Sequence, residues 1–142
     1  MTGTVPANIL YGWHVLVVDD EPDAIEVVET LLMMYGANVV TAHNGREAIE
    51  KIRQFRPRFV IADLSMPEMS GWQMIEIIKN DRTTMDIPIV ALTAHAMQGD
   101  RNRAMAKGFH NFLTKPLRPE TFVTELLALL ANDIPELAHI LN

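Results

Sequence analysis

The chain has 142 residues, of which 49% are hydrophobic, no cysteine, and a formal net charge of −6 at pH 7. This length predicts one domain that buries about two thirds of its unfolded surface. The lack of cysteine excludes disulfides and thiol chemistry, and the negative charge argues against direct binding of nucleic acid. No apolar stretch is long enough to insert into a membrane and the first residues lack a secretion signal, so we expect a cytoplasmic protein.

We divide the chain into an N-terminal lead over 1–13, one domain over 14–131 and a C-terminal tail over 132–142. Within the domain, short apolar runs typical of buried strands alternate with segments whose apolar residues recur at helical spacing. The expected strands are His14–Val18, Val39–Thr41, Phe59–Asp63, Ile87–Leu92 and Asn111–Leu113. The expected helices run from Pro22 to a closing Gly36, from a cap at Asn44 to just before Pro57, and over Trp72–Lys79, Met97–Lys107 and Pro119–Ala131.

Five strands that alternate with five helices predict an α/β fold with a parallel sheet, covered by helices on both faces and joined by right-handed crossovers. The second strand is expected at an edge of this sheet. Ser70, with Gln73 three residues on, predicts a capping box at the start of the third helix.

The last helix and the tail carry more apolar residues than the sheet alone needs. The wide apolar arc consists of Phe122, Val123, Leu126, Leu127, Leu129 and Leu130. Two explanations stay open, a core that extends under this helix or a surface for a partner such as a second copy of the chain. Around Pro135, the spacing of Ile134, Leu137 and Leu141 allows a short helix that packs back on the domain or helps it to dimerise.

Polar residues gather where the expected strands end. Asp19 and Asp20 follow the first strand, Asp63 ends the third, Thr93 follows the fourth and Lys115 follows the fifth. Each has an ordinary explanation alone, such as a helix cap or a solvated charge. Because the carboxyl ends of parallel strands meet at one rim, where α/β folds bind ligands, we interpret them together as a site.

The charges of this set indicate its chemistry. Three crowded carboxylates repel one another, so one of them is protonated or a divalent cation lies between them. Oxygen ligands without cysteine or histidine favour Mg²⁺. A carboxylate nucleophile beside such an ion, with a lysine and a hydroxyl group, suits phosphoryl transfer to an aspartate.

The chain resembles the receiver domains of two-component response regulators, of the stand-alone, single-domain type. The resemblance covers about Val15 to Leu130 and rests on four ordered motifs. They are Val17-Val18-Asp19-Asp20-Glu21-Pro22, Val60 to Gly71 (VIADLSMPEMSG), Leu92-Thr93-Ala94 and Leu113-Thr114-Lys115-Pro116. The resemblance implies a flavodoxin-like (βα)5 sheet, doubly wound, with strand order 2-1-3-4-5.

The same resemblance implies roles for the residues at the rim. Asp63 accepts a phosphoryl group from a histidine kinase or a histidine phosphotransfer protein. Mg²⁺ is held by Asp20, Asp63 and the backbone carbonyl of Ser65, with Asp19 close by or acting through water. Lys115 pairs with the phosphoryl oxygens, and Thr93 turns inward to bind one of them.

The resemblance also implies a switch. When Thr93 turns toward the phosphoryl group, Phe112 can rotate into the vacated space and change the face formed by the fourth helix, the fifth strand and the fifth helix. Many relatives have tyrosine at the position of Phe112, and an ordinary core role for this phenylalanine stays open. Ser65 and His95 flank the expected phosphoryl site, and neither suits the orientation of an attacking water, so we expect a long-lived phosphoaspartate.

We therefore expect a phosphoprotein of a two-component or phosphorelay system that regulates a downstream target protein, catalyses only its own phosphorylation and dephosphorylation, and is otherwise not an enzyme. One alternative is a pseudo-receiver that binds partners without being phosphorylated. A second is an aspartyl-phosphate hydrolase of the haloacid dehalogenase type, which is disfavoured because that family has a second aspartate where this chain has Ser65. The sequence does not distinguish a terminal regulator from a relay intermediate.

Overall fold

The computed structural model describes residues 5–64, 69–93, 98–115 and 117–141. It contains a parallel sheet of five strands in the order β2-β1-β3-β4-β5, which confirms the predicted fold and the edge position of β2. The strands are β1 (His14–Val18), β2 (Asn38–Ala42), β3 (Phe59–Asp63), β4 (Ile89–Thr93) and β5 (Asn111–Thr114).

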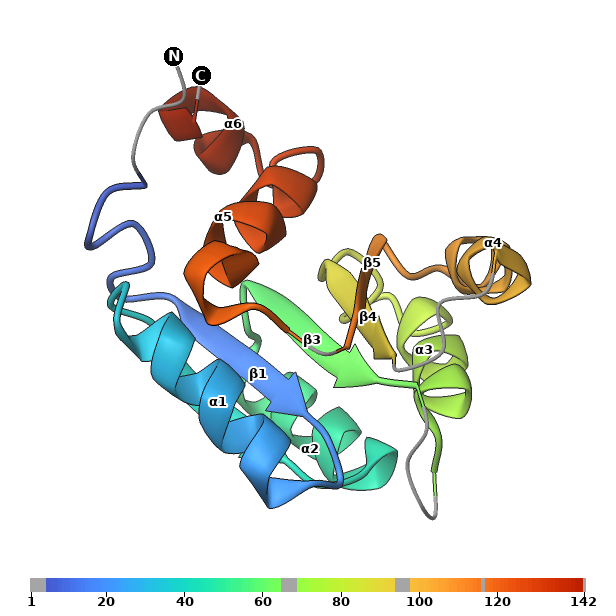
Figure 1. The fold of residues 1–142 in the computed structure, drawn as a ribbon. Helices are drawn as coiled ribbons and strands as arrows, with labels where there is room; N and C mark the ends of the chain where they lie inside the picture. The colour runs from blue at the N-terminus through green and yellow to red at the C-terminus, as the bar shows by residue number, and fades with distance from the viewer. Residues whose placement is uncertain (1–4, 65–68, 94–97, 116, 142) are drawn as a thin grey trace.

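Helices cover both faces of the sheet (Figure 1). They are α1 (Pro22–Met33), α2 (Gly45–Phe55), α3 (Gly71–Lys79), α4 (Gln98–Lys107), α5 (Pro119–Leu130) and α6 (Pro135–Leu141). Two clusters of buried side chains, one on each face, reflect this arrangement. The first joins α1, α5 and α6 to one face, and the second joins α2, α3 and α4 to the other.

The central strands are buried because helices cover both of their faces, which explains their unbroken apolar sequences. All five residues of β3 and of β4 are buried, including the polar Asp63 and Thr93. β4 begins at Ile89, two residues later than expected, because Pro88 has no N–H group to donate to the ladder. Its carbonyl still accepts the N–H group of Val60 at 2.9 Å.

The helix ends follow the local signals of the sequence. Ser70 and Gln73 form the predicted capping box of α3. Helix α1 ends at Met33, and the chain then turns through Gly36, which has a φ of +95°. The N–H group of Ala37 donates to the carbonyl of Leu32 at 3.3 Å, and that of Gly36 donates to Met33 at 3.0 Å. These two bonds are those of a Schellman turn, in which a glycine closes the helix.

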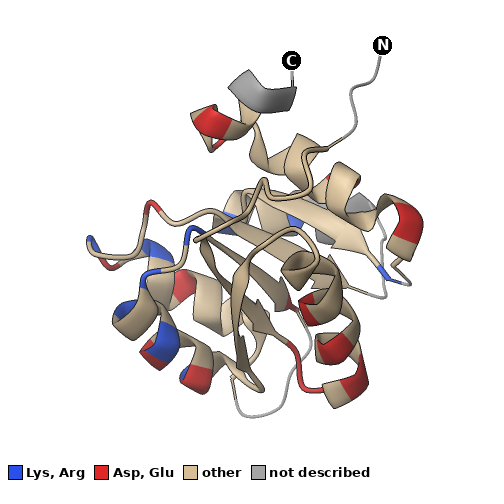
Figure 2. Ribbon diagram, turned by 90° about the vertical axis from the view of Figure 1, so that its left-hand side faces the viewer, with Lys and Arg blue, Asp and Glu red and all other residues tan. Residues whose placement is uncertain are grey.

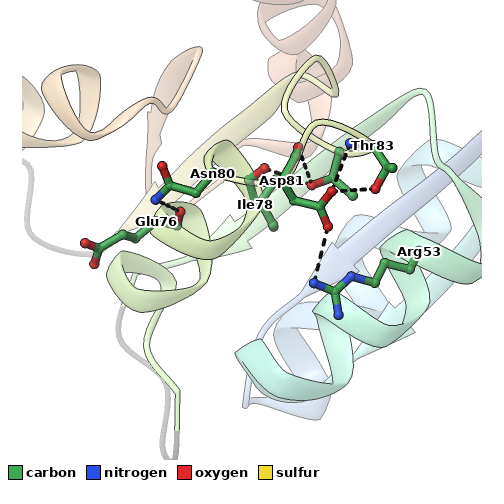
Figure 3. Close-up of polar contacts among 7 residues, drawn as sticks. Arg53, Glu76, Ile78, Asn80, Asp81 and Thr83 are labelled. Carbon is green, nitrogen blue, oxygen red and sulfur yellow. Dashed lines mark hydrogen bonds and ion pairs between the residues drawn. The ribbon is translucent and has the colours of Figure 1, made fainter.

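The turn after α3 is fixed by a network around Asp81 (Figure 3). One oxygen of this carboxylate accepts hydrogen bonds from the backbone and the hydroxyl group of Thr83, at 2.9 and 2.7 Å. The other pairs with Arg53 of α2 at 3.3 Å. The bonds from Thr83, together with Arg53, lower the pKa of Asp81 below its usual value. The network ties α2 to the turn between α3 and β4.

The N-terminal lead and α6 both pack at the end of the sheet where the strands begin, away from their carboxyl ends (Figure 1). Leu10 and Leu137 are completely buried, and Ile9 and Ile134 are nearly so. All four belong to the cluster that contains α5. Arg58 connects the two segments, because its guanidinium lies 4.1 Å from the ring centroid of Trp13 and pairs with Glu136 at 2.6 Å.

This packing covers the wide apolar arc of α5 within the chain. Phe122, Val123, Leu126, Leu127 and Leu130 are buried, and Leu129 packs partly buried against the same cluster. Of the two explanations for the arc, the extended core therefore accounts for its burial in this structure. Among the residues that the structure describes, no helix is long and apolar enough to cross a membrane.

His110 connects the beginnings of β4 and β5. Its Nδ1 atom accepts the N–H group of Ile89 at 3.0 Å, and its own backbone N–H group donates to the carbonyl of Ile89 at 2.8 Å. An Nδ1 atom that accepts a hydrogen bond carries no proton, so this contact requires the neutral imidazole. Burial and then the charge of Lys79 lower the pKa of His110 below 6.5, although Asp133 opposes them.

We predict that His110 makes stability depend on pH below neutrality. A lowered folded-state pKa means that the unfolded chain binds the proton more tightly. The contribution of His110 is therefore complete above the unfolded pKa of about 6.5 and is lost as the pH falls through the folded pKa. Urea unfolding between pH 7.5 and about 5.5, a window above most carboxyl titrations, should show falling stability in the wild type and a flatter profile in His110→Gln. Equal profiles would contradict this role, and His43→Gln, at an exposed position, is the control.

Candidate acidic site

The fold brings the polar strand-end residues to one rim of the sheet. Asp63 and Thr93 are the last residues of β3 and β4, and Asp19 and Lys115 directly follow β1 and β5. The parallel register places Asp63 beside Leu92 and Thr93 beside Thr114. The N–H group of Lys115 donates to the carbonyl of Thr93 at 2.7 Å, which fixes the end of β5 against β4.

Three carboxylates meet at this rim. Asp19, Asp20 and Asp63 each offer an oxygen atom, and these atoms all lie within 4.8 Å of one another. Asp19 and Asp63 are only 1% and 6% exposed, whereas Asp20 is exposed. The negative charge is therefore partly buried and opens to solvent on the side of Asp20.

Lys115 lies between the two buried carboxylates. Its Nζ atom is 2.9 Å from an oxygen of Asp19 and 3.5 Å from an oxygen of Asp63. Burial by itself would lower the pKa of this ammonium. The hydrogen bond to Asp19 and the charges of Asp63, Asp19 and Glu21 outweigh burial together, so the pKa of Lys115 is raised above its usual value. The lysine thus stays charged and offsets part of the repulsion between the two aspartates.

Backbone contacts hold Asp19 in place. The second oxygen of Asp19 accepts the N–H group of Glu21 at 3.1 Å, just before α1 begins. The N–H group of Asp19 donates to the carbonyl of Ala42, at the end of β2. The side chain of Asp19 is therefore fixed from two sides, by Lys115 and by the turn into α1.

Gly71 lets α3 begin directly against the backbone of Asp63. A Cβ atom at this position would collide with the carbonyl oxygen of Asp63 and would lie 2.9 Å from the Cα atom of Leu64. The N–H group of Gly71 donates to the carbonyl of Leu64 at 3.2 Å. This role of Gly71 was not predicted, although a glycine at the first position of a helix can signal such a close approach.

Of the other predicted functional residues, the structure describes Phe112 but not Ser65 or His95. Phe112, in β5, is partly buried and packs against the cluster on the side of α2, α3 and α4. Ser65 and His95 lie outside the described residues. Their predicted roles, and those of Thr93 and Phe112 in switching, stay predictions.

Acidic and basic residues are distributed unevenly over the helices on the two faces of the sheet (Figure 2). Helix α1 contains Asp23, Glu26 and Glu29 and no lysine or arginine, whereas α2 mixes both signs. The acidic helix α1 therefore begins directly after the carboxylates of Asp19 and Asp20.

Comparison with known proteins identifies the family. Residues 15–127 match the model of the response regulator receiver domain. The chain belongs to this family. This receiver domain is 29% identical over 118 residues to the polar-differentiation response regulator DivK of Brucella anthropi, across 83% of the chain and 96% of that protein.

Solved structures support the same conclusion. The chemotaxis response regulator CheY4 of Vibrio cholerae has a TM-score of 0.78 and 31% sequence identity, and the match covers 83% of this chain and 98% of that one. Receiver domains also occur within larger proteins. The chain is 36% identical over 130 residues to the sensor protein GacS of Pseudomonas syringae pv. syringae, with 87% of the chain aligned to only 14% of that protein.

We predict that Gly71→Ala destabilises the domain by about 1–3 kcal/mol, because the added methyl group forces α3 away from β3. Alanine otherwise favours a helix over glycine, so a loss of stability can be assigned to the collision with Asp63 and Leu64. Urea unfolding measures the effect. Thr124→Ala, on the exposed side of α5, should change stability by less than about 0.5 kcal/mol. A Gly71→Ala protein as stable as this control would show that α3 can shift without cost.

Proposed function

We propose that this receiver domain is a phosphorylation-dependent switch of a two-component or phosphorelay system, and that Asp63 is the phosphoacceptor. The observation that carries the proposal is the position of Lys115, whose ammonium lies 2.9 and 3.5 Å from the carboxylates of Asp19 and Asp63. A buried carboxylate with a charged lysine beside it is equipped to receive an anionic group. The family membership of residues 15–127 supports the same reading.

The residues present fit a bound Mg²⁺. Three carboxylate oxygens within 4.8 Å of one another form a hard, all-oxygen donor set with one side open to solvent, as suits a cation that keeps several waters. Asp20 and Asp63 would hold the ion, with Asp19 close by or acting through water, together with the carbonyl of Ser65 that the family resemblance implies. The cation would neutralise part of the negative charge on the phosphoryl oxygens.

In the proposed reaction, an oxygen of Asp63 forms a bond to the phosphorus atom of a phosphohistidine on a kinase or phosphotransfer protein. The P–N bond of the donor breaks, and its electron pair stays on the imidazole nitrogen, which takes up a proton. The product is an acyl phosphate on Asp63. Hydrolysis of the acyl phosphate by water restores the carboxylate and releases inorganic phosphate. The proposal assigns the domain only these two reactions, its own phosphorylation and dephosphorylation.

Lys115 and Thr93 would respond to the new group. Lys115 would exchange its contact with Asp63, at 3.5 Å, for one with a phosphoryl oxygen, because a group on this carboxylate would stand next to the same ammonium. Thr93, at the end of the neighbouring strand, would donate a hydrogen bond from its hydroxyl group to another phosphoryl oxygen. Inward rotation of Phe112 would then change the face of α4, β5 and α5, and this face would be read by a downstream target protein.

The proposal predicts a Mg²⁺-dependent gain of one phosphoryl group from acetyl phosphate, lost in Asp63→Asn because the amide is not a nucleophile. Intact mass spectrometry measures the gain directly. Asp20→Asn should need more Mg²⁺ for the same rate, because one metal ligand is neutralised.

Glu29→Gln, on the acidic α1 but away from the rim, is the matched control for loss of a carboxylate and should behave as the wild type. Equal phosphorylation of Asp63→Asn would place the phosphoacceptor elsewhere. If neither acetyl phosphate nor a phosphorylated histidine phosphotransfer protein modifies the wild type, the domain is a pseudo-receiver that only binds partners.

We also predict a long-lived phosphoaspartate. Neither Ser65 nor His95 is an amide or a carboxylate that would orient water toward the acyl phosphate. After the phosphodonor is removed, the phosphorylated mass should persist well beyond the seconds that a self-hydrolysing site allows. Ser65→Asn would introduce such an amide and should shorten the lifetime, and decay of the wild type within seconds would contradict the prediction.

A further inference from the structure

Trp72 contacts two neighbouring elements. It is the second residue of α3, next to Gly71. The guanidinium of Arg103, on α4, lies 4.2 Å from the centroid of the indole ring. The ring of Phe109, which precedes β5, meets the indole edge to face, with centroids 6.0 Å apart and planes at 87°. Trp72 thus contacts both α4 and the segment that leads into β5.

The start of α3 has little freedom to move independently of Asp63. The Cα atom of Gly71 has no room for a side chain because the carbonyl of Asp63 and the Cα atom of Leu64 lie against it. A displacement of the backbone at Asp63 therefore pushes directly on the first turn of α3, which carries Trp72. Phe112 packs against the same buried cluster as Trp72.

The described side chains of α4 are mostly exposed. Of its described side chains, from Asn102 to Lys107, only Ala104 is buried. Arg103 is exposed to solvent yet lies over the indole ring, which is the geometry of a cation–π contact. Its contact with Trp72 therefore joins the described part of α4 to the first turn of α3.

We infer that Trp72 and Arg103 are positioning residues that couple the acidic site to α4. Their contact favours the position of α4 seen in this structure, and a phosphoryl group on Asp63 shifts the first turn of α3 and weakens the contact. This inference rests on the proposed function and deepens it, since it gives α4 a connection to Asp63 that does not pass through Thr93. Because coupling is reciprocal, loss of the Arg103 charge should favour the phosphoryl-bound state.

The test uses beryllofluoride, a stable analogue of the phosphoryl group, with Mg²⁺. Arg103→Met keeps the alkyl stem but removes the charge, and we expect it to bind the analogue about two- to fivefold more tightly, as loss of one exposed cation–π contact would give. Arg103→Lys keeps a cation and should stay close to the wild type. Lys107→Met, which removes another exposed charge of α4, is the matched control and should not change the affinity. Calorimetric titration measures all four proteins.

A spectroscopic readout separates coupling from a merely structural role. The chain has two tryptophans, so Trp13→Phe leaves Trp72 as the reporter. Its emission should change when beryllofluoride binds, and Arg103→Met should remove most of that change. A purely structural Arg103 would lower the stability of the unliganded protein without altering the affinity or the emission change, and that result would overturn the inference.

The two proposals fail in different ways. If wild-type protein gains a phosphoryl group by mass but Arg103→Met matches it in affinity and emission change, the coupling is wrong and the proposed function stands. If wild-type protein binds no beryllofluoride and gains no phosphoryl group while Asp63→Asn behaves identically, the proposed function is wrong and the coupling fails with it.

Discussion

The buried negative charge at the carboxyl ends of β1 and β3 is the constraint on which this structure depends. Asp19 and Asp63 are almost completely inaccessible to water, and their carboxylates lie within reach of one ammonium group. Two buried carboxylates without a cation would repel each other, and removal of one partner from a buried ion pair costs about 3–5 kcal/mol. Lys115 supplies the opposite charge. Its attachment to the end of β5 means that the outermost strand on that side is tied electrostatically to the centre of the sheet.

This arrangement makes the site responsive to added charge. Lys115 already divides one positive charge between two carboxylates, so a phosphoryl group on Asp63 has to change the contacts of the lysine. The helices on the two faces of the sheet differ in how much of their described surface is buried. On one face α5 is packed against α1, α6 and the N-terminal lead, with fully buried Leu10, Leu126 and Leu137 between them. On the other face the described part of α4 is anchored by Ala104 and by Arg103 on Trp72. Rearrangement at the rim is therefore most easily accommodated by α4.

The fold and the acidic rim could be predicted because both depend on patterns within single segments. Unbroken apolar strands, glycine turns and a capping box are local signals, and the parallel sheet then brings the strand ends together whatever their distance in sequence. Contacts between different helices and strands have no such local signal in the sequence. The pairing of Arg103 with Trp72 joins α4 to α3, and the burial of Leu137 by α5 depends on where the tail folds. The sequence showed that Leu137 is apolar and helically spaced, but two explanations for that pattern remained until the packing was known. The start of β4 was misplaced by two residues because the apolar run continues through Pro88.

The segments outside the matched residues 15–127 bear on how a signal could leave the site. The N-terminal lead and α6 meet at the end of the sheet where the strands begin, and Arg58 connects them through Trp13 and Glu136. They cover the apolar side of α5, whereas among the described side chains of α4, from Asn102 to Lys107, only Ala104 is buried. In the proposed switch, the packed helix α5 would serve as a reference against which a displaced α4 and a rotated Phe112 are recognised. A partner that reads this face would then distinguish the two states by the position of α4 relative to α5, because a face whose parts all moved together would present the same surface in both states.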